Sequence, residues 1–467
     1  NKMMHDTLIL CCHEGVKETK QAFGNLFSQV DYLCKAHGIK VADKIAIQTM
    51  RRHSNSQEPL SSEDLKYDAR ALAIFISAVF GVDVPHELNV LIPHTNRPYQ
   101  KGLEINNRRI RCIVKNWDSD FIRVDIDQDA DEEEYLVQLK DEENHIDHTY
   151  LWDILKEGMQ LNLLDCQVKQ PVITPRLIVV EPDYLVDISS IATCFTAFGH
   201  HPLLYLLNQM KPRANTQATL LGNFAGAALD DIINTNGKYQ MNETIKTNFR
   251  EKALEFCTCP WFDAKKFYTD ANQQAFNLQQ VVDILFPRTA SQAQMSAFRG
   301  ESLYDRKKAI LEPSFVCEAL GIQGRVDLMT TDCKLLVEQK SGRNMNIETH
   351  QTDPSYHSYQ LEPHYVQLLL YYGVLQHNFK LSNDRVNIRL LYSKYQPQDG
   401  LMVVAYYQKL FKEAIEYRNQ LVAASFEIAK EGFEHALNEF TPEVLNVAGT
   451  QDFFYNKYLK PQIEAIT

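Results

Sequence analysis

Residues 321–343 read GIQGRVDLMTTDCKLLVEQKSGR, and they are the most informative segment of the chain. It contains two apolar-rich runs, residues 324–330 and 335–340, joined by the short polar segment TDCK at 331–334. Two strand-like runs around so short a connection predict an antiparallel hairpin. The charged residues of this hairpin are therefore expected to lie on the faces of a sheet.

Pairing across the turn brings two carboxylates together. If Asp332 and Cys333 form a two-residue turn, paired residue numbers have a constant sum, and Asp327 lies opposite Glu338. Opposed side chains are about 5 Å apart, close enough for two carboxylates to bind one cation. Lys340, two residues further on, shares that face. Because Asp-Cys is not a favoured hairpin turn, a register shifted by one or two residues stays open.

These residue types suit the hydrolysis of a phosphodiester with the help of a metal ion. Asp327 and Glu338 would offer hard oxygen ligands to Mg²⁺ or Mn²⁺. Such an ion polarises the phosphoryl oxygen and lowers the pKa of the attacking water. Lys340 would orient that water or stabilise charge in the transition state. The alternative is an ordinary surface hairpin with a salt bridge from Glu338 to Lys340 or Lys334.

A second group of polar residues lies downstream. Residues 363–379, PHYVQLLLYYGVLQHNF, have a helical period that places Gln367 and Tyr371 one turn apart on the same face. Taken alone, this pair reads equally well as a polar stripe on a helix that packs against a core.

Together these segments resemble the motifs of RecB-like PD-(D/E)XK nucleases. The GRxD, ExKxG and QxxxY blocks of that family match Gly324-Arg325-Val326-Asp327, Glu338-Gln339-Lys340-Ser341-Gly342 and Gln367 with Tyr371. The resemblance implies a mixed sheet flanked by helices. It also implies that Asp327, Glu338, Lys340, Gln367 and Tyr371 are catalytic residues, the last two contacting the phosphate backbone or holding the lysine in place.

Four further segments make the resemblance more particular. They are similar to the nuclease region of the nuclease-helicase family that trims Okazaki flaps and resects DNA ends. They are residues 182–192 (PDYLVDISSIA), 222–229, 312–327 and 417–419, and the likeness covers roughly residues 90–460. It implies cleavage of single-stranded or flap DNA in replication, repair or recombination, with Glu312 as an additional metal ligand.

Two departures from that family stand out. The first ligand of its iron-sulfur cluster corresponds to Ala197, and no cysteine follows Cys333, so we predict no cluster. Cys257 and Cys259 have a one-residue spacer that suits no common metal knuckle. The second departure is a metal-binding helix histidine, which Gly226 replaces. The role of the neighbouring pair His200-His201 stays open, with a surface or buffer role favoured over ligation.

Composition bounds the class of protein. The chain has 467 residues, 45% of them hydrophobic, which is enough for two or three domains. The ten cysteines lack the spacing of a disulfide framework, and no signal-peptide order or membrane-length apolar run is present, so we expect a cytoplasmic location and no membrane partner. The formal net charge of −12 argues mildly against a passive nucleic-acid coat. Much of the acidity lies in the run 125–134, expected to be a solvated loop, and candidate phosphate contacts are Arg108, Arg109, Arg111, Arg343, Arg385 and Arg389.

We expect three regions along the chain. Residues 1–95 should be helical, with helices at 17–37 and 68–80 that stop at Gly38 and Gly81. Residues 96–185 should form a β-barrel of OB type, with strands at 109–114 and 122–126. Trp117 and Phe121 of that barrel would either stack on single-stranded DNA or, the favoured interpretation, pack its core. Residues 186–467 should form the PD-(D/E)XK domain, with helices at 198–210, 220–234, 243–256, 363–379 and 402–429 and a strand at 386–392.

The expected partners follow from the same resemblance. No Walker A loop is present, and the sequence begins with Asn, so we expect a piece of a longer nuclease-helicase or a nuclease that works with a separate helicase. A single-strand-binding protein is a further expected partner. The alternative function is a catalytically degenerate module that positions DNA for a helicase, which Gly226 favours. A restriction-type double-strand endonuclease is a more remote alternative, because nothing marks a sequence-reading domain.

Overall fold

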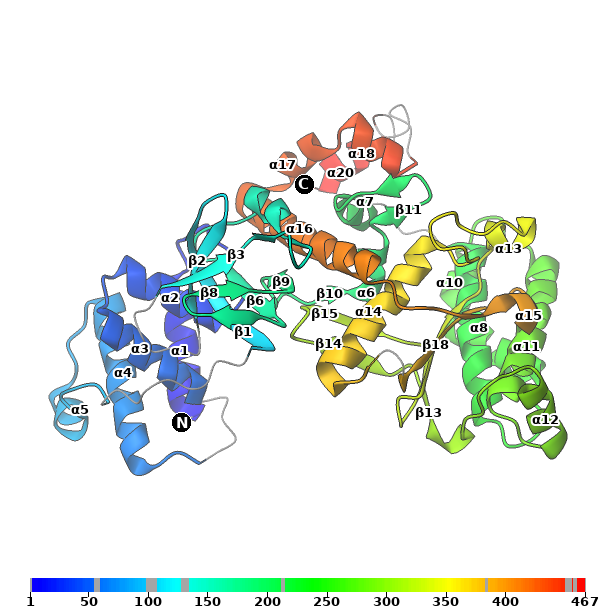
Figure 1. Ribbon diagram of the computed structural model, residues 1–467, viewed down its shortest axis with the longest axis horizontal. Helices are drawn as coiled ribbons and strands as arrows, with labels where there is room; N and C mark the ends of the chain where they lie inside the picture. The colour runs from blue at the N-terminus through cyan, green and yellow to red at the C-terminus, as the bar shows by residue number, and fades with distance from the viewer. Residues whose placement is uncertain are drawn as a thin grey trace. The chain divides into compact units, whose positions relative to one another are not determined.

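The computed structural model describes residues 2–53, 59–97, 107–126, 134–210, 215–382, 385–449, 456 and 460–466. The structure is mixed α/β, with many helices and both parallel and antiparallel strand pairs, as the sequence predicts (Figure 1). The chain divides into two units. The first comprises Asn1–Leu185, Glu318–Gly321 and Val422–Ala436, and the second comprises Val186–Cys317, Ile322–Leu421 and Leu437–Thr467.

The first unit begins with a group of helices. They are α1 (Lys2–Gly15), α2 (Leu26–Ala36), α3 (Val41–His53), α4 (Ser62–Phe80) and α5 (His86–Leu91). The first four bury a common apolar core that includes Leu8, Val30, Leu33, Ile47 and Phe75. Burial of such side chains is the main source of stability for short helices in water.

Local capping sets where these helices begin and end. The predicted end of α4 at Gly81 is confirmed, because Gly81 adopts a left-handed conformation (φ 65°) that favours glycine. The predicted helix over 17–37 is wrong in its first half, since α1 ends at Gly15 and α2 starts after Asn25. The Asn25 side chain accepts the backbone N–H of Ser28, which is an N-cap that starts a new helix.

A seven-stranded sheet, in the order β7-β8-β3-β2-β1-β6-β9, forms the other part of the first unit. Neighbouring strands are antiparallel except β3 and β8, which are parallel. Within the described residues, no pairing joins the end strands β7 and β9. The strands are β1 (Arg109–Trp117), β2 (Phe121–Ile126), β3 (Tyr135–Gln138), β6 (Gln160–Leu164), β7 (Gln167–Lys169), β8 (Val172–Thr174) and β9 (Leu177–Val180), with a small hairpin of β4 (Lys140–Asp141) and β5 (Ile146–Asp147) and a 3-10 turn η1 (Thr149–Asp153) after β3.

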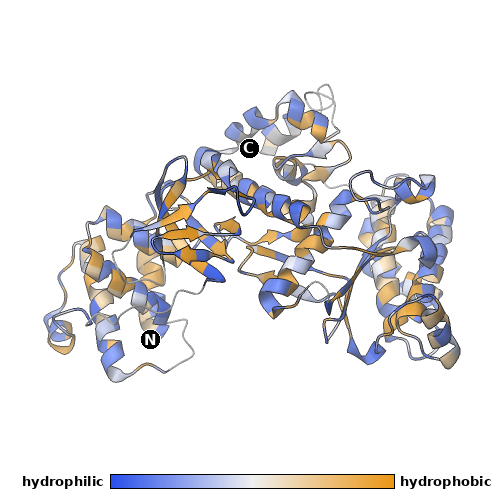
Figure 2. Cartoon of the chain, viewed as in Figure 1, coloured by the Kyte–Doolittle hydropathy of each residue, from blue (hydrophilic) through white to orange (hydrophobic). Residues whose placement is uncertain are grey.

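This sheet buries an apolar core on one face. The residues of β2 alternate, with Ile122, Val124 and Ile126 buried, and Figure 2 shows hydrophobic residues concentrated along these strands. The two strands predicted in this region are confirmed. Trp117 packs against the core, as the packing interpretation expects. Most of the acidic run 125–134 lies outside the described residues.

The second unit contains two larger sheets. A five-stranded sheet has the order β13-β16-β17-β18-β19, and a three-stranded sheet has the order β10-β15-β14. Their strands are β10 (Val186–Asp187), β13 (Ala309–Leu311), β14 (Ser314–Cys317), β15 (Ile322–Arg325), β16 (Leu328–Thr330), β17 (Leu335–Lys340), β18 (Asn387–Tyr392) and β19 (Leu401–Val403). A short hairpin joins β11 (Phe195–Thr196) to β12 (Gly199–His200), and a 3-10 turn η2 (Arg306–Lys308) precedes β13.

Helices cover the five-stranded sheet. Leu328, Leu335 and Val337 share an apolar core with α8 (Gln217–Asn234) and α11 (Ala264–Leu285), so these two helices lie against one face. The parallel pair β17 and β18 requires a crossover, which contains α14 (Glu362–Phe379). The other helices are α6 (Ile188–Ala192), α7 (Leu204–Met210), α9 (Met241–Glu251), α10 (Ala253–Cys257), α12 (Ala290–Phe298), α13 (Met345–Thr349), α15 (Pro397–Gly400), α16 (Gln408–Glu431), α17 (Phe433–Glu439), α18 (Pro442–Val447) and α20 (Lys460–Ile466).

Four elements of the second unit differ from the prediction. The helix expected over 243–256 is divided at Lys252 into α9 and α10, and the helix expected over 402–429 starts at Gln408, because Leu401–Val403 form the edge strand β19. The strand expected over 324–330 is broken, because β15 ends at Arg325 and β16 begins at Leu328, and the two strands belong to different sheets. The helix expected over 198–210 starts later, since the β11–β12 hairpin occupies its first residues. In the part of the chain that the structure describes, no helix has both the length and the apolar character needed to cross a bilayer.

Candidate active site

The hairpin of β16 and β17 has the register that the sequence predicts. Leu328 pairs with Val337 and Met329 with Leu336, so Asp327, just before β16, lies opposite Glu338. The break between β15 and β16 falls at Asp327 itself. There its Oδ2 accepts the backbone N–H of Gln339 at 2.6 Å, which fixes the carboxylate beside β17.

Glu338 and Lys340 share the sheet face turned away from α8 and α11. Leu335 and Val337 pack against those helices, and strand residues alternate, so the intervening side chains point to the opposite face. The Lys340 Nζ donates to Glu338 Oε1 at 2.8 Å. This ion pair is the one that the surface-hairpin alternative expects. However, Glu338 is only 6% exposed, which a surface salt bridge does not explain.

One oxygen of Glu338 has no hydrogen-bond partner among the described residues. Its Oε2 is buried and accepts no hydrogen bond from the described residues, whereas Oε1 is bonded to Lys340. Leaving a buried carboxylate oxygen unsatisfied costs at least about 1–3 kcal/mol. Such a group is expected to have a function that repays its burial, and the binding of a cation is the simplest one for a carboxylate.

The electrostatics of the pair point the same way. Burial raises the pKa of Glu338 to about 7, an effect that the Lys340 ammonium opposes and the Asp327 charge adds to. Burial also raises the pKa of Asp327, against the hydrogen bond from Gln339. Two carboxylates that resist ionising together would be stabilised in their charged form by a divalent cation.

Glu312 lies next to this pair. Its backbone N–H donates to the Asp327 carbonyl oxygen at 3.0 Å, which explains its proximity. Its side chain forms an ion pair with Arg325 at 3.3 Å. The structure therefore brings Glu312 beside the site, with its carboxylate held by an arginine.

Asp230 is a residue of the site that the sequence analysis missed. It lies on α8, and burial, followed by the charges of Glu312 and Asp327, raises its pKa to about 6. The signal was present in the sequence, because Asp230 follows Gly226 by four residues and so shares its helix face. The structure thus provides an acidic side chain on α8, one turn after Gly226.

Helix α14 turns one polar face toward the site. Tyr371 donates its hydroxyl to the Arg325 carbonyl oxygen at 2.7 Å, and burial with the charges of Glu338 and Asp327 raises its pKa. Tyr371 therefore fixes the backbone that leads into Asp327. The Gln367 Oε1, one turn earlier, is buried without a hydrogen-bond partner among the described residues, and so has an acceptor free for a ligand.

His364 joins the same face and was also missed. Its Nδ1 lies 2.9 Å from the Tyr392 hydroxyl. Burial, with the nearby charge of Lys340, lowers its pKa to about 3, so the ring is neutral at ordinary pH. The spacing of three residues before Gln367 and seven before Tyr371 was the available signal.

The pair Asp327 and Glu338 fits a hard divalent ion but supplies only part of its coordination. Among the described residues, no group of three or more His, Cys, Asp or Glu side chains is arranged to hold a metal ion. Mg²⁺ usually keeps several waters and takes one or two carboxylates from the protein. The two carboxylates, one of them with an unpartnered oxygen, and a main-chain carbonyl such as that of Val337 are consistent with that pattern.

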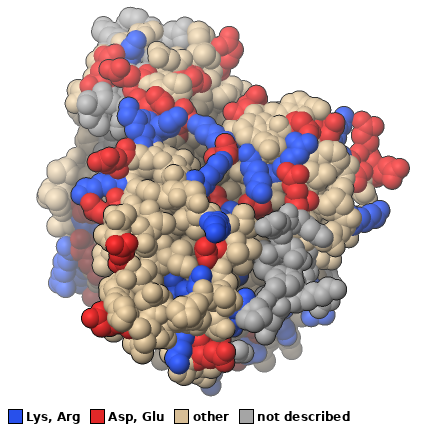
Figure 3. All heavy atoms as spheres, turned by 90° about the vertical axis from the view of Figure 1, so that its left-hand side faces the viewer, with Lys and Arg blue, Asp and Glu red and all other residues tan. Residues whose placement is uncertain are grey.

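Other charged residues singled out in the sequence have structural partners. On the face drawn in Figure 3, Lys and Arg side chains are mixed with Asp and Glu side chains. Arg111 forms a two-pronged contact with Asp183, and the buried Arg389 does the same with Glu301. These two arginines stabilise the fold, which removes them as free phosphate contacts.

His200 is held between two glutamates. Its Nε2 lies 2.7 Å from Glu362 and its Nδ1 lies 2.8 Å from Glu413. These hydrogen bonds raise its pKa to about 9, so the ring is charged at neutral pH. His200 therefore ties β12 to α14 and α16 and is not placed to ligate a metal at Asp327.

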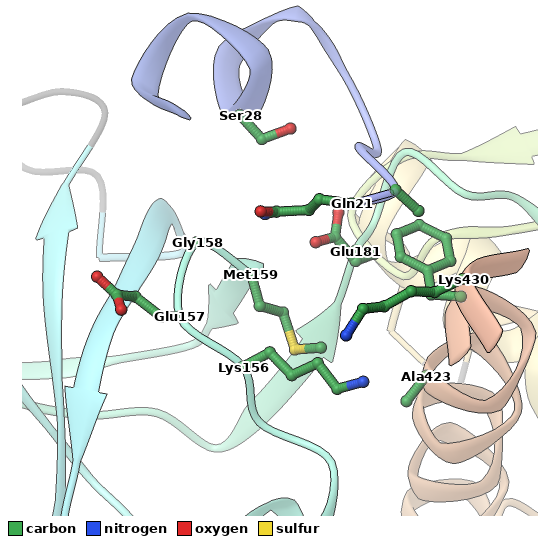
Figure 4. A pocket seen from close by; sticks show the side chains of 11 residues that line it. Gln21, Ser28, Lys156, Glu157, Gly158, Met159, Glu181, Ala423 and Lys430 are labelled. Atoms are coloured by element: carbon green, nitrogen blue, oxygen red, sulfur yellow. The ribbon is translucent and has the colours of Figure 1, made fainter. Parts of the chain in front are cut away.

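A separate cavity of about 240 Å³ lies within the first unit (Figure 4). The ammonium groups of Lys156 and Lys430 converge in it, and burial, with the Lys430 charge, lowers the pKa of Lys156. Each lysine also has a carboxylate partner, Glu427 for Lys156 and Glu431 for Lys430. Because both charges are already neutralised, we place no catalytic step there.

Comparison with known proteins adds no assignment. Neither the models of known protein families nor the curated proteins contain a match to this chain. The function must therefore be argued from the residues of the site.

Proposed function

We propose that this chain is a Mg²⁺- or Mn²⁺-dependent deoxyribonuclease that hydrolyses phosphodiesters of single-stranded or flap DNA. The observation that supports it best is the pair of opposed carboxylates, Asp327 and Glu338, with Lys340 beside them and one buried Glu338 oxygen left without a partner. A buried carboxylate with one oxygen unsatisfied lowers stability, and a catalytic metal site is a reason to retain it.

Each residue has a role in this proposal. Asp327 and Glu338 would hold the ion, with Glu312 or the Val337 carbonyl assisting. The bound ion would polarise the phosphoryl oxygen and activate a water. Lys340 would exchange its contact with Glu338 for the attacking water or the charged phosphate. The Gln367 amide would contact the DNA backbone.

The wider assignment is part of the same proposal. We infer that the second unit has a PD-(D/E)XK fold and that residues 96–185 form an OB-type barrel that guides single-stranded DNA, with Phe121 as a stacking candidate. A helicase, fused or separate, would supply unwound DNA, and a single-strand-binding protein would be a further partner. Replication, repair or recombination in the cytoplasm is the expected setting.

A second candidate is a degenerate module that binds DNA for a helicase without cutting it. Two observations favour it: Gly226 replaces the family histidine, and the described residues contain no three-ligand metal group. Retention of Asp327, Glu338 and Lys340 together favours catalysis.

The deciding experiment is cleavage of end-labelled single-stranded, flapped and blunt duplex DNA with Mg²⁺, Mn²⁺ or EDTA. We expect metal-dependent cutting of single-stranded and flapped DNA, and a loss of about 10²- to 10³-fold or more in Lys340→Ala. Lys334→Ala is the matched control, because Lys334 is exposed in the same hairpin but lies outside the site. DNA that binds but stays uncut under every condition would favour the degenerate module.

A further inference from the structure

A cavity in the second unit is lined in part by Ser341, Gly342 and Arg343, which directly follow Lys340 in the chain. It has a volume of about 490 Å³ and is lined by α8, the segment before α11, α11 itself and Ser341-Gly342-Arg343. Small-molecule sites have volumes of about 300–1,000 Å³, so the space suits a group the size of a nucleobase. Ser341 and Gly342 directly follow Lys340, so the cavity lies at the end of β17 on the side of α8 and α11, and a bound strand would pass around that end to reach the face of Lys340.

Trp261 stands at the rim of this cavity with its ring free. It is 98% exposed, although a tryptophan is usually well buried. Its φ of 56° is left-handed, which is uncommon for a bulky residue. An exposed indole offers a flat face on which an unpaired base can stack.

Gln274 lines the same cavity from α11 and is only 2% exposed. Its Nε2 donates to the Ser341 carbonyl oxygen at 2.9 Å, which fixes the amide. Its Oε1 is buried and has no hydrogen-bond partner among the described residues. A fixed, unsatisfied acceptor beside an open space is expected to accept an N–H from a ligand, and the Watson–Crick edges of bases carry such donors.

The charges around the cavity balance. Lys266, Arg343 and Lys394 line it together with the carboxylates of Asp263 and Asp270, and Glu348 lies beside Arg343 and Lys394. Lys266 pairs with Asp270, and Arg343 and Lys394 both contact Glu348. A Cβ added to Gly342 would meet no atom within 4 Å. The space beside Gly342 is therefore open to a DNA strand that runs between Lys340 and the cavity.

We propose that this cavity binds one unpaired base of the DNA strand whose phosphodiester lies at Asp327 and Glu338. Trp261 stacks on the base, and the Gln274 Oε1 accepts a hydrogen bond from its edge. A base within a duplex has both faces stacked and its edge paired, so this site accepts single strands only. The position of the cut relative to the base rests on the proposed function, whereas the binding of the base does not.

The test is a binding measurement in EDTA, so that cleavage plays no part. Fluorescence anisotropy of a labelled oligothymidylate and of an abasic oligomer of equal length would be recorded with the full chain. We expect Trp261→Ala to weaken the binding of oligothymidylate about tenfold and to leave the abasic oligomer unaffected, because only the former offers a base to stack. Gln274→Met should act in the same direction. Phe298→Ala is the control, since Phe298 is 90% exposed on α12 of the same unit and lies outside the cavity.

An unchanged affinity in Trp261→Ala, or an equal loss for both oligomers, would overturn the proposal. A different result would reject the proposed nuclease function. If no metal supports cleavage but Trp261 still governs the binding of oligothymidylate, the base site stands and the catalytic assignment is rejected. If the chain cuts DNA and Trp261→Ala changes neither binding nor cleavage, only the base site is rejected.

Discussion

The seven-stranded sheet of the first unit and the five-stranded sheet of the second unit bury different kinds of polar side chain. In the first sheet, the buried polar side chains of the strands are the amides of Gln160 and Asn162, and the buried carboxylate of Glu181, directly after β9, accepts the backbone N–H of Gln160 through Oε1. The Gln160 side chain bonds with Asn25 and Asp183, and that of Asn162 donates to the carbonyl oxygens of Glu318 and Ala319. In the second sheet, the buried polar side chains of the strands include a carboxylate, that of Glu338, which is bonded to Lys340 through Oε1. The strands of the first sheet thus bury amide side chains, whereas a strand of the second sheet buries an ionisable carboxylate beside a lysine.

The second sheet can hold that carboxylate because its two faces have separate tasks. Leu335 and Val337 pack with α8 and α11 and supply apolar burial. The residues between and after them, Glu338 and Lys340, face the other way. The raised pKa of Glu338 shows that the fold resists its charge. The apolar packing on one face of the sheet thus offsets the free-energy cost of burying the Glu338 carboxylate on the other.

The largest effect should come from damage to the first sheet. Leu163→Ala removes a fully buried side chain from its core and should lower the free energy of unfolding by about 2–5 kcal/mol. Urea denaturation followed by circular dichroism would measure this loss. Metal-dependent cleavage by the folded variant should persist, because no catalytic residue is touched. A loss below about 1 kcal/mol would mean that this sheet is less tightly packed than its burial suggests.

In the second sheet, a substitution of a buried residue is expected to raise the free energy of unfolding instead of lowering it. The pKa of Glu338 rises from its ordinary value of 4.5 to about 7 on folding, so the folded state binds the proton more tightly. The associated stability is present below about pH 4.5 and is lost as pH rises to about 7. Glu338→Gln should therefore raise the free energy of unfolding by about 1–3 kcal/mol at pH 8 and change it little at pH 4.

Thermal unfolding without divalent ions at both pH values would test this prediction. Glu312→Gln, which alters an exposed carboxylate near the same site, is the control and should change the free energy of unfolding little. The stabilised Glu338→Gln should also be inactive. Equal stability of wild type and variant at pH 8 would show that Glu338 is compensated in a way that its contacts do not indicate.

The contrast between the sheets also explains what the sequence could and could not predict. The register of Asp327 opposite Glu338 follows from the period of a strand and the length of one turn, so it was predictable. The interruption between β15 and β16 at Asp327 was not predictable, because GRVDLMT has a uniform strand-like character. Asp230 and His364 come from helices far away in the sequence, and only packing brings them to the hairpin. Local pattern thus specified the hairpin, whereas tertiary contacts completed the site.

The smallest effect, and the most specific, concerns the open space at Gly226. A Cβ added there would meet no atom within 4 Å, and Asp230, one turn later on α8, lies within electrostatic reach of Asp327 and Glu312. Gly226→His should place an imidazole beside the carboxylates and tighten Mn²⁺ binding about tenfold, or about 1.4 kcal/mol. Titration calorimetry with Mn²⁺, without DNA, would measure it. Gly226→Ala is the matched control, because it also removes the helix-weakening glycine but adds no metal ligand. If both variants bind Mn²⁺ as the wild type does, the space at Gly226 does not adjoin the metal site, and α8 serves the second sheet only as its apolar support.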